Sequence, residues 1–323
     1  MKQPVWHWLG GMALLALSLN TWAADKSIHQ GIVDNYKAEK VSDHVYVIHG
    51  PAGQPSKENQ GFINNPGFIV GDSEVAVVDP GSSAAIGRAV LAHIRKVTDK
   101  PVTKVFITHI HGDHWLGNQA FKEANADTRF YASAGMIEEA KNGAGDSWVE
   151  TMNTMTENAT AGTEIVIPGE PLSQDQAIKV GNVTVKAHLV EGKAHTSNEV
   201  MFEVVEDKLL FTGDTISNKR LIMMDEGSFP GSASNAERIS AMDVKTIVPG
   251  HGATGDKAIV TAYGKYMSTL YSAVKELRET MEAHEMKPKV IEKLTDSKDW
   301  HSFDEILGKH ISLAILEAEQ EDF

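Results

Sequence analysis

Short strand-like runs and longer helical ones follow each other along the first half of the chain. "HVYVIHG" (44–50) and "GFIVGDSEVAVVDPG" (67–81) are β-branched runs interrupted by Gly-Asp-Ser turn residues, which predicts strands. Residues 82–97 have apolar side chains four apart and a serine available as N-cap, which predicts a helix. Three further segments are predicted as a buried strand, a helix and a strand: 104–111, 115–124 and 128–133.

The second half repeats this mixture after a looser helical region at 136–161. Two hairpins are predicted, at 177–190 and 199–214. They are followed by a short helix, a strand, a long helix with one apolar stripe, and a polar, acidic helical end: 236–242, 245–252, 256–284 and 287–323. Strands that alternate with helices in both halves indicate an α/β fold. We expect one main domain over residues 24–285 and a C-terminal helical extension over 286–323.

The first residues have the layout of a secretory signal peptide. Lys2 precedes an apolar core at residues 8–19, and Thr21-Trp22-Ala23 gives a small-residue exit. The core is too short to span a bilayer comfortably. We therefore expect residues 1–23 to be cleaved and the protein to be released into a periplasm, with no membrane insertion afterwards.

Composition narrows the chemistry that this chain can carry. It has no cysteine, which excludes a thiolate nucleophile, a disulfide framework and a sulfur-ligated metal. The formal net charge of −14 repels phosphate backbones, so we expect a small-molecule substrate rather than nucleic acid.

The stretch "THIHGDHWLGN" (108–118) concentrates His109, His111, Asp113 and His114 at the end of a predicted strand. His109 and His111 alternate along that strand end, so their rings should project to one side. Four unpaired polar side chains in one buried turn would be costly to desolvate. Imidazoles mixed with a carboxylate are instead ligands for a divalent metal ion.

A metal ion needs further ligands, and three downstream residues occupy suitable positions. His195 in "GKAHTSNE", Asp214 in "LLFTGDT" and His251 in "TIVPGHG" each lie at a predicted junction of strand and loop, where functional residues are commonly mounted. His310 and several other histidines lack such partner spacing, so we expect them to pack or to face solvent.

The motifs "THIHGDHWLGN", "AHT", "LLFTGD" and "VPGHG", in this order, resemble those of the metallo-β-lactamase-fold hydrolases. The early "VVDPG" resembles that family's first motif, and the likeness extends over residues 44–263. It implies a four-layer αββα sandwich with the metal site at one edge, between the two β-sheets.

The resemblance also implies a role for each residue. His109, His111 and His195 would bind one metal ion, Asp113, His114 and His251 a second, and Asp214 would bridge the two. Asp79 would orient a ligand, although an aspartate here could equally cap a loop. Two ions, most simply zinc, can share a water and lower its pKa to about 7. Asp113 is then the candidate proton acceptor, and iron or manganese stay open as metals.

Three activities compete within this family. The first is hydrolysis of an ester, thioester or lactone by a metal-bound hydroxide, the second is β-lactam hydrolysis, and the third is mononuclear iron oxidoreductase chemistry. True metallo-β-lactamases carry cysteine or serine where Asp214 stands, so the chain looks closer to the periplasmic quinoprotein-associated zinc hydrolases and the glyoxalase II-like branch. Substrate choice is expected to lie in residues 143–176 and 216–235, where Lys219 and Arg220 could meet a substrate carboxylate.

Overall fold

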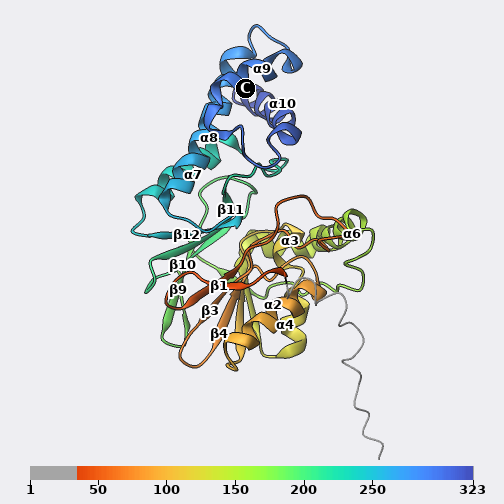
Figure 1. Ribbon diagram of the computed structural model, residues 1–323, viewed down its shortest axis with the longest axis vertical. Helices are drawn as coiled ribbons and strands as arrows, with labels where there is room; N and C mark the ends of the chain where they lie inside the picture. The colour runs from red at the N-terminus through yellow and green to blue at the C-terminus, as the bar shows by residue number, and fades with distance from the viewer. Residues whose placement is uncertain (1–34, 323) are drawn as a thin grey trace, which may run out of the picture.

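Two β-sheets lie face to face at the centre of the protein (Figure 1). The structure, a computed structural model, describes residues 35–322, so the expected signal peptide at residues 1–23 lies outside the described residues. The first sheet contains, in spatial order, β1 (Ala38–Lys40), β2 (Val45–Ile48), β3 (Gly67–Val70), β4 (Val75–Val78), β5 (Val102–Phe106), β6 (Arg129–Ser133) and β7 (Glu170–Leu172). The second contains β12 (Thr246–His251), β11 (Leu209–Ser217), β10 (Val200–Val204), β9 (Val183–Leu189) and β8 (Ala177–Val180).

The alternation of side chains along β4 shows why the first sheet is buried on both faces. Val75 and Val77 pack with the helices outside the sheet, whereas Ala76 and Val78 pack against the second sheet. Successive side chains of a strand point to opposite faces, so an unbroken apolar run fits a strand covered on both sides.

Helices cover the outer face of each sheet. Those that belong to the first sheet are α2 (Ala84–Val97), α3 (Gly112–Trp115), α4 (Asn118–Ala124), α5 (Ala134–Glu139) and α6 (Gly145–Met155), with a kinked turn at Ala140–Ala144 between the last two. The second sheet is covered by α7 (Phe229–Ala241) and α8 (Lys257–Leu277), and α9 (Ala283–Lys293) and α10 (Phe303–Gln320) pack on α8. One apolar core lies between the sheets and one beneath each helical layer, which confirms the expected αββα sandwich.

The helix limits follow from local capping. The Ser83 side chain accepts a hydrogen bond from the Ile86 amide, as expected for the helix predicted at 82–97. The helix predicted at 236–242 instead begins at Phe229, because the Ser228 side chain caps the Gly231 amide and Pro230 fits the first turn. The long helix predicted to reach residue 284 ends at Leu277, and a capping box of Glu282 and Glu285 starts α9.

The helices α8, α9 and α10 extend away from the sandwich at the C-terminal end of the chain (Figure 1). Met286 of α9 and Ile306 of α10 share the apolar core that Val260 and Leu270 of α8 enter. The domain limit expected after residue 285 falls inside α9, and the division of the chain into domains stays a prediction. Within residues 35–322, none of the helices has the combination of length and apolar character needed to cross a bilayer.

Candidate metal centre

All seven residues proposed from the sequence as ligands meet at one edge of the sandwich. Their potential ligand atoms form two groups, and within each group these atoms all lie within 4.8 Å of one another. The first group is His109, His111, His195 and Asp214, and the second is Asp113, His114 and His251. Every member except the half-buried His111 is buried. The family resemblance implied the same division of the six other residues and gave Asp214 a bridging position, which stays a prediction.

The loop after β5 brings in four of the seven residues. The strand ends at Phe106, so the prediction that it continues to His111 is wrong. The Asp79 carboxylate accepts the Thr108 amide at 2.8 Å and thereby takes the chain out of the strand ladder. The rings of His109 and His111 still lie together, with centroids 4.8 Å apart.

Asp113 and His114 belong to the short helix α3, which starts immediately after His111. The Trp115 indole donates to the Ile110 carbonyl at 2.7 Å and closes this turn. Both side chains therefore come from a turn that is fixed by a buried hydrogen bond, rather than from a mobile loop.

The second sheet supplies Asp214 and His251 from neighbouring parallel strands. Asp214 lies in β11, and His251 ends β12. Gly250 is required here, because a Cβ at that position would lie 1.9 Å from the Asp214 Oδ1. The glycine in "VPGHG" thus has a steric role beside the site.

Asp79 links the two groups by fixing one histidine in each. Its Oδ2 accepts from His114 Nδ1 at 2.8 Å and from the Thr108 hydroxyl at 2.7 Å. Since that hydroxyl donates to Asp79, its oxygen is free to accept from His109 Nδ1, 3.0 Å away. Both histidines are therefore held with Nδ1 protonated and Nε2 directed at the cluster. Asp79 caps the loop and orients ligands at once.

His251 is held in the same tautomer by a different partner. Its Nδ1 lies 2.8 Å from the Ile63 carbonyl, which can only accept, so the proton is on Nδ1. Its Nε2 faces Asp113 Oδ2 at 3.4 Å and Asp214 Oδ2 at 3.2 Å. The Arg220 Nη1 lies 3.0 Å from this Nδ1, but both are donors, so Arg220 packs beside the ring without a hydrogen bond to it. Its Nη2 donates to the Gly53 carbonyl at 2.6 Å.

Burial sets the protonation of most of these imidazoles. It lowers the pKa of His109 and His111, and it lowers that of His195 to about 3, so these rings are neutral at physiological pH. Burial also disfavours the charged form of His114, but the carboxylates of Asp113, Asp214 and Asp79 outweigh it and raise the pKa of His114. Burial alone would raise the pKa of Asp214, yet His251 and His114 hold it well below its usual range.

Several polar atoms in the cluster lack a hydrogen-bond partner within residues 35–322, and these atoms show whether a metal ion would fit. His109 Nε2, His114 Nε2 and Asp214 Oδ1 are buried and have no hydrogen-bond partner among the described residues. Leaving such atoms unsatisfied costs about 1–3 kcal/mol each. Imidazole nitrogens and carboxylate oxygens gathered in this way fit a divalent metal ion.

Two residues that the sequence did not single out hold this arrangement in place. Glu199 is buried and accepts from the Thr196 amide and from the Thr215 hydroxyl, so it ties the His195 loop to the Asp214 strand. Burial raises the pKa of Glu199 to about 7. Asn65 donates to the carbonyls of Pro249 and Gly252 on both sides of His251.

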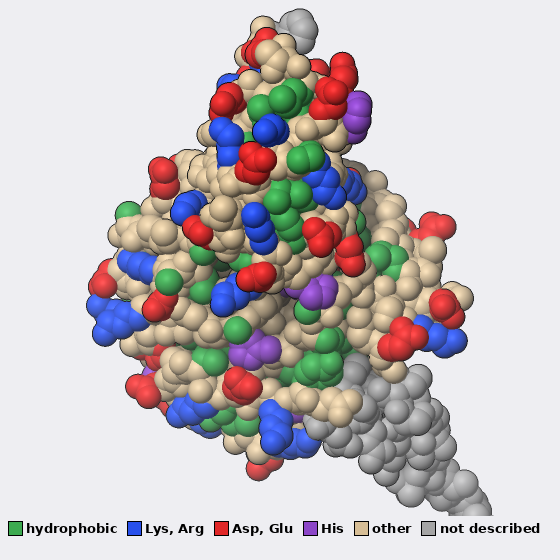
Figure 2. Space-filling view, turned by 45° about the horizontal axis from the view of Figure 1, so that its top comes forward, with side chains coloured by type: hydrophobic (Ala, Val, Ile, Leu, Met, Phe, Trp, Pro, Cys, Tyr) green, Lys and Arg blue, Asp and Glu red, His purple; other side chains and the backbone are tan. Residues whose placement is uncertain are grey.

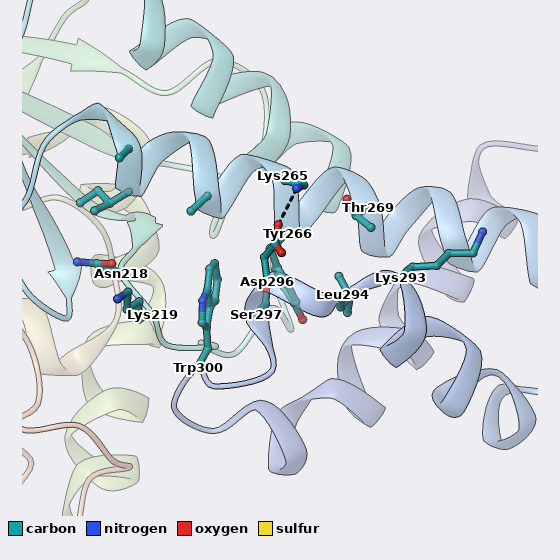
Figure 3. A pocket seen from close by; sticks show the side chains of 13 residues that line it. Asn218, Lys219, Lys265, Tyr266, Thr269, Lys293, Leu294, Asp296, Ser297 and Trp300 are labelled. Carbon is teal, nitrogen blue, oxygen red and sulfur yellow. Dashed lines mark hydrogen bonds and ion pairs between the residues drawn. The ribbon is translucent and has the colours of Figure 1, made fainter.

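A hollow of about 330 Å³ opens beside the two groups. Both stretches expected to select the substrate border it, through Trp148, Met152 and Met155 and through Ile222 and Met223. Arg220 lines it too, whereas Lys219 lines a neighbouring hollow. Lys219 also borders a separate hollow of about 310 Å³, which is lined by Tyr266 of α8 and by Trp300 (Figure 3) and contains none of the seven residues.

Comparison with solved structures supports the fold. A metallo-beta-lactamase from Pontibacter korlensis is similar with a TM-score of 0.56 and 17% identity, covering 70% of this chain and 95% of its own. A crystal structure of VMB-1 is similar with a TM-score of 0.54 and 17% identity, covering 72% and 97%. At such identities the likeness concerns the fold alone.

Sequence comparison gives one short match and one long one. A linear primary-alkylsulfatase from Pseudomonas sp. (strain ATCC 19151) is 36% identical over 66 residues, which are 19% of this chain and 12% of that protein's length. The family model described as the metallo-beta-lactamase superfamily matches residues 60–251, well over half of the 323-residue chain. This match includes all seven clustered residues, and the chain belongs to the metallo-beta-lactamase superfamily.

Proposed function

We propose that the protein is an exported hydrolase that holds two zinc ions and cleaves a carbonyl ester, thioester or lactone. The observation that carries the proposal is the division of seven ligand residues into two adjacent groups. Asp214 supports a bridging role, because its carboxylate lies 3.3 Å from both His195 in the first group and His114 in the second. Two divalent ions bound there would supply Lewis acidity and a water that ionises near neutral pH.

Asp113 is the residue that we assign to proton transfer. It is buried, and the positive charge and hydrogen bond of His114 outweigh the cost of burial and lower the pKa of its carboxyl group. Its Oδ2 lies 3.4 Å from both His114 and His251, at the wall of the 330 Å³ hollow. A carboxylate in this position can accept a proton from an attacking water and return it to the leaving group.

The choice of zinc and of a periplasmic location rests on the sequence. An exported chain that folds outside the cytoplasm takes its metal there. Iron(II) binds weakly in the Irving–Williams order, and copper prefers softer ligands or other geometries. Iron or manganese remain the alternatives that metal analysis has to exclude.

Asp214 also favours ester-type substrates over β-lactams. Between two bound metal ions, the Asp214 carboxylate would lower the net positive charge that the ions offer to the amide anion released from a β-lactam ring. An alkoxide or a thiolate is less basic and needs less stabilisation. The mononuclear iron alternative has less support, because His111, His114 and His251 complete both ligand groups.

A panel of hydrolysis assays tests the proposal. The purified protein is given an aryl ester, a thioester, a lactone, a penicillin and, in view of the short alkylsulfatase match, a linear alkyl sulfate. We expect kcat/KM on one of the first three to exceed that on the penicillin by at least about a hundredfold, equivalent to about 2.7 kcal/mol. A tenfold preference for the penicillin or the alkyl sulfate would contradict the proposal.

A further inference from the structure

The hollow beside the ligand groups has two chemically different walls. One is built from candidate ligands, including His111 and Asp113. The other is apolar and comes from two separate elements, α6 and the loop between β11 and α7. An ester substrate has the same division, since its carbonyl must reach the ligand groups while the rest of the molecule lies against the other wall.

Two methionines on this apolar wall are unusually exposed. Met155 of α6 is 40% exposed and Met223 of the facing loop is 39% exposed, although most large apolar side chains of the described residues are buried. Exposed apolar side chains that converge on one hollow indicate a binding surface. Methionine is flexible and fills irregular gaps, which suits a chain with many conformers better than a rigid ring.

The apolar wall lies directly against the ligand residues. The Trp148 ring packs on His111 with centroids 4.7 Å apart. Gly112 favours this close approach, because a Cβ there would lie 3.1 Å from Trp148 and 3.2 Å from Met152 and would push both side chains outward. A chain attached to a carbonyl beside His111 would therefore pass straight onto Trp148 and continue toward the methionines.

The mouth of the hollow is acidic. Glu226 and Asp225 line it and are exposed. Asp225 is paired with Lys309 at 2.6 Å, whereas Glu226 has no ion pair within residues 35–322. Arg220 does not neutralise Glu226, because its guanidinium is buried beside His251 and bonded to Gly53. An anionic tail would be repelled at the mouth, and a neutral one would not.

We propose that the substrate carries a neutral, unbranched aliphatic chain that lies over Trp148 and between Met155 and Met223. This inference rests on the proposed function and specifies its substrate class. If each non-hydrogen atom takes the roughly 30 Å³ that a water molecule occupies in the liquid, the hollow of about 330 Å³ accommodates about ten such atoms. The selected chain thus has about eight carbons beyond the reacting group.

Binding of neutral alcohols tests the chain site without any hydrolysis. Calorimetric titration of the purified protein with linear 1-alkanols of about four to about ten carbons should show affinity rising about two- to fourfold per methylene, up to about eight carbons. The double variant Met155→Gln/Met223→Gln should flatten this rise. Leu316→Gln is the matched control, because Leu316 is 54% exposed on α10 and lies outside the hollow.

A second titration tests the acidic mouth. An alkanol of about eight carbons that ends in a carboxylate should bind at least about tenfold more weakly than the neutral alcohol. Glu226→Gln should reduce that difference, whereas Glu150→Gln, an exposed control on α6, should not. Equal affinity for all chain lengths, or an unchanged rise in the double variant, would overturn the inference. If alkanol affinity rises with chain length as expected but none of the esters, thioesters or lactones is hydrolysed, the proposed reaction is rejected and the chain-binding site is retained.

Discussion

Asp79 accepts a hydrogen bond from His114 Nδ1 at 2.8 Å, and through the Thr108 hydroxyl it also orients His109. One carboxylate thus sets the tautomer of a histidine in each ligand group. Its backbone has φ of 52°, a conformation that asparagine tolerates well. Asp79 can therefore be replaced by asparagine without disturbing the turn.

We predict that Asp79→Asn weakens metal binding at both groups by about 10- to 100-fold while the fold is retained. The amide of Asp79→Asn would direct an N–H group at His114 Nδ1 and the Thr108 hydroxyl, which both donate to the Asp79 carboxylate. Competition with a chelator of known affinity measures the loss, and circular dichroism checks the fold. Thr108→Val should remove only the hydrogen bond that orients His109 and should therefore weaken metal binding at the first group alone. If both variants lost metal affinity equally at both groups, Asp79 would not orient His109 and His114 through separate hydrogen bonds.

His251 belongs to the second ligand group alone, so its removal should reduce the metal content by one ion. We predict close to two ions per chain in the purified protein and close to one in His251→Ala. Native mass spectrometry with elemental analysis measures the count. His284→Ala, an exposed control on α9, should keep two. A single redox-active iron in the unmodified protein would favour the oxidoreductase alternative.

Asp214→Asn should keep the fold and lose at least about a hundredfold in kcat/KM, equivalent to about 2.7 kcal/mol. Activity should fall because the amide removes the negative charge between the two groups. The fold should persist because β11, which carries residue 214, is held by its pairing with β10 and β12. Thermal unfolding and steady-state assays measure the two effects. Near-normal turnover would contradict a bridging role.

Gly250→Ala gives an independent test of the same carboxylate. Its Cβ would lie 1.9 Å from the Asp214 Oδ1 and 2.8 Å from the Gly213 backbone, so Asp214 has to move. We expect loss of activity and of metal content although every ligand residue is present. Gly169→Ala, where a Cβ would meet open space, is the control. Full activity of Gly250→Ala would show that the position of Asp214 is not critical.

The seven candidate ligand residues could be picked out from the sequence because each stands in a short motif with fixed local spacing. His109 to His114 lie within six consecutive residues, and Asp214 and His251 come at the end of apolar runs that predict strands. Each lies at a predicted junction of strand and loop, and the family resemblance placed these distant residues in one site. The alternation of strands and helices predicted the α/β class, whereas the αββα order came from the family resemblance.

The residues that hold the ligands could not be predicted, because their partners are distant. Asn65 reaches Pro249 and Gly252, 184 and 187 residues away, and nothing near Asn65 in the sequence indicates it. Glu199 directly precedes β10 and accepts from Thr215, 16 residues away, so its burial depends on the pairing of β10 with β11. The end of β5 at Phe106 likewise depends on Asp79, 29 residues from Thr108.

His310 was expected to have no special partner, yet it is buried between Tyr266 and Ile222. The Ile222 carbonyl can only accept, so His310 Nε2 donates to it at 2.8 Å, and Nδ1 accepts from the Tyr266 hydroxyl at 2.8 Å. The bond to Ile222 connects α10 to the loop that borders the 330 Å³ hollow beside the two ligand groups. Burial lowers the pKa of His310 to about 4, although the Ile222 carbonyl and Asp225 oppose the shift.

Stability should therefore fall as the pH drops from 6.5 toward 4. In this window the unfolded chain binds a proton at His310 and the folded protein does not, which costs the fold up to about 3 kcal/mol. In chelator-treated protein, His310→Gln should keep both hydrogen bonds and lose this dependence. Denaturant titrations at several pH values measure it. The ligand histidines contribute equally to both proteins, so identical pH profiles would exclude His310 as the source.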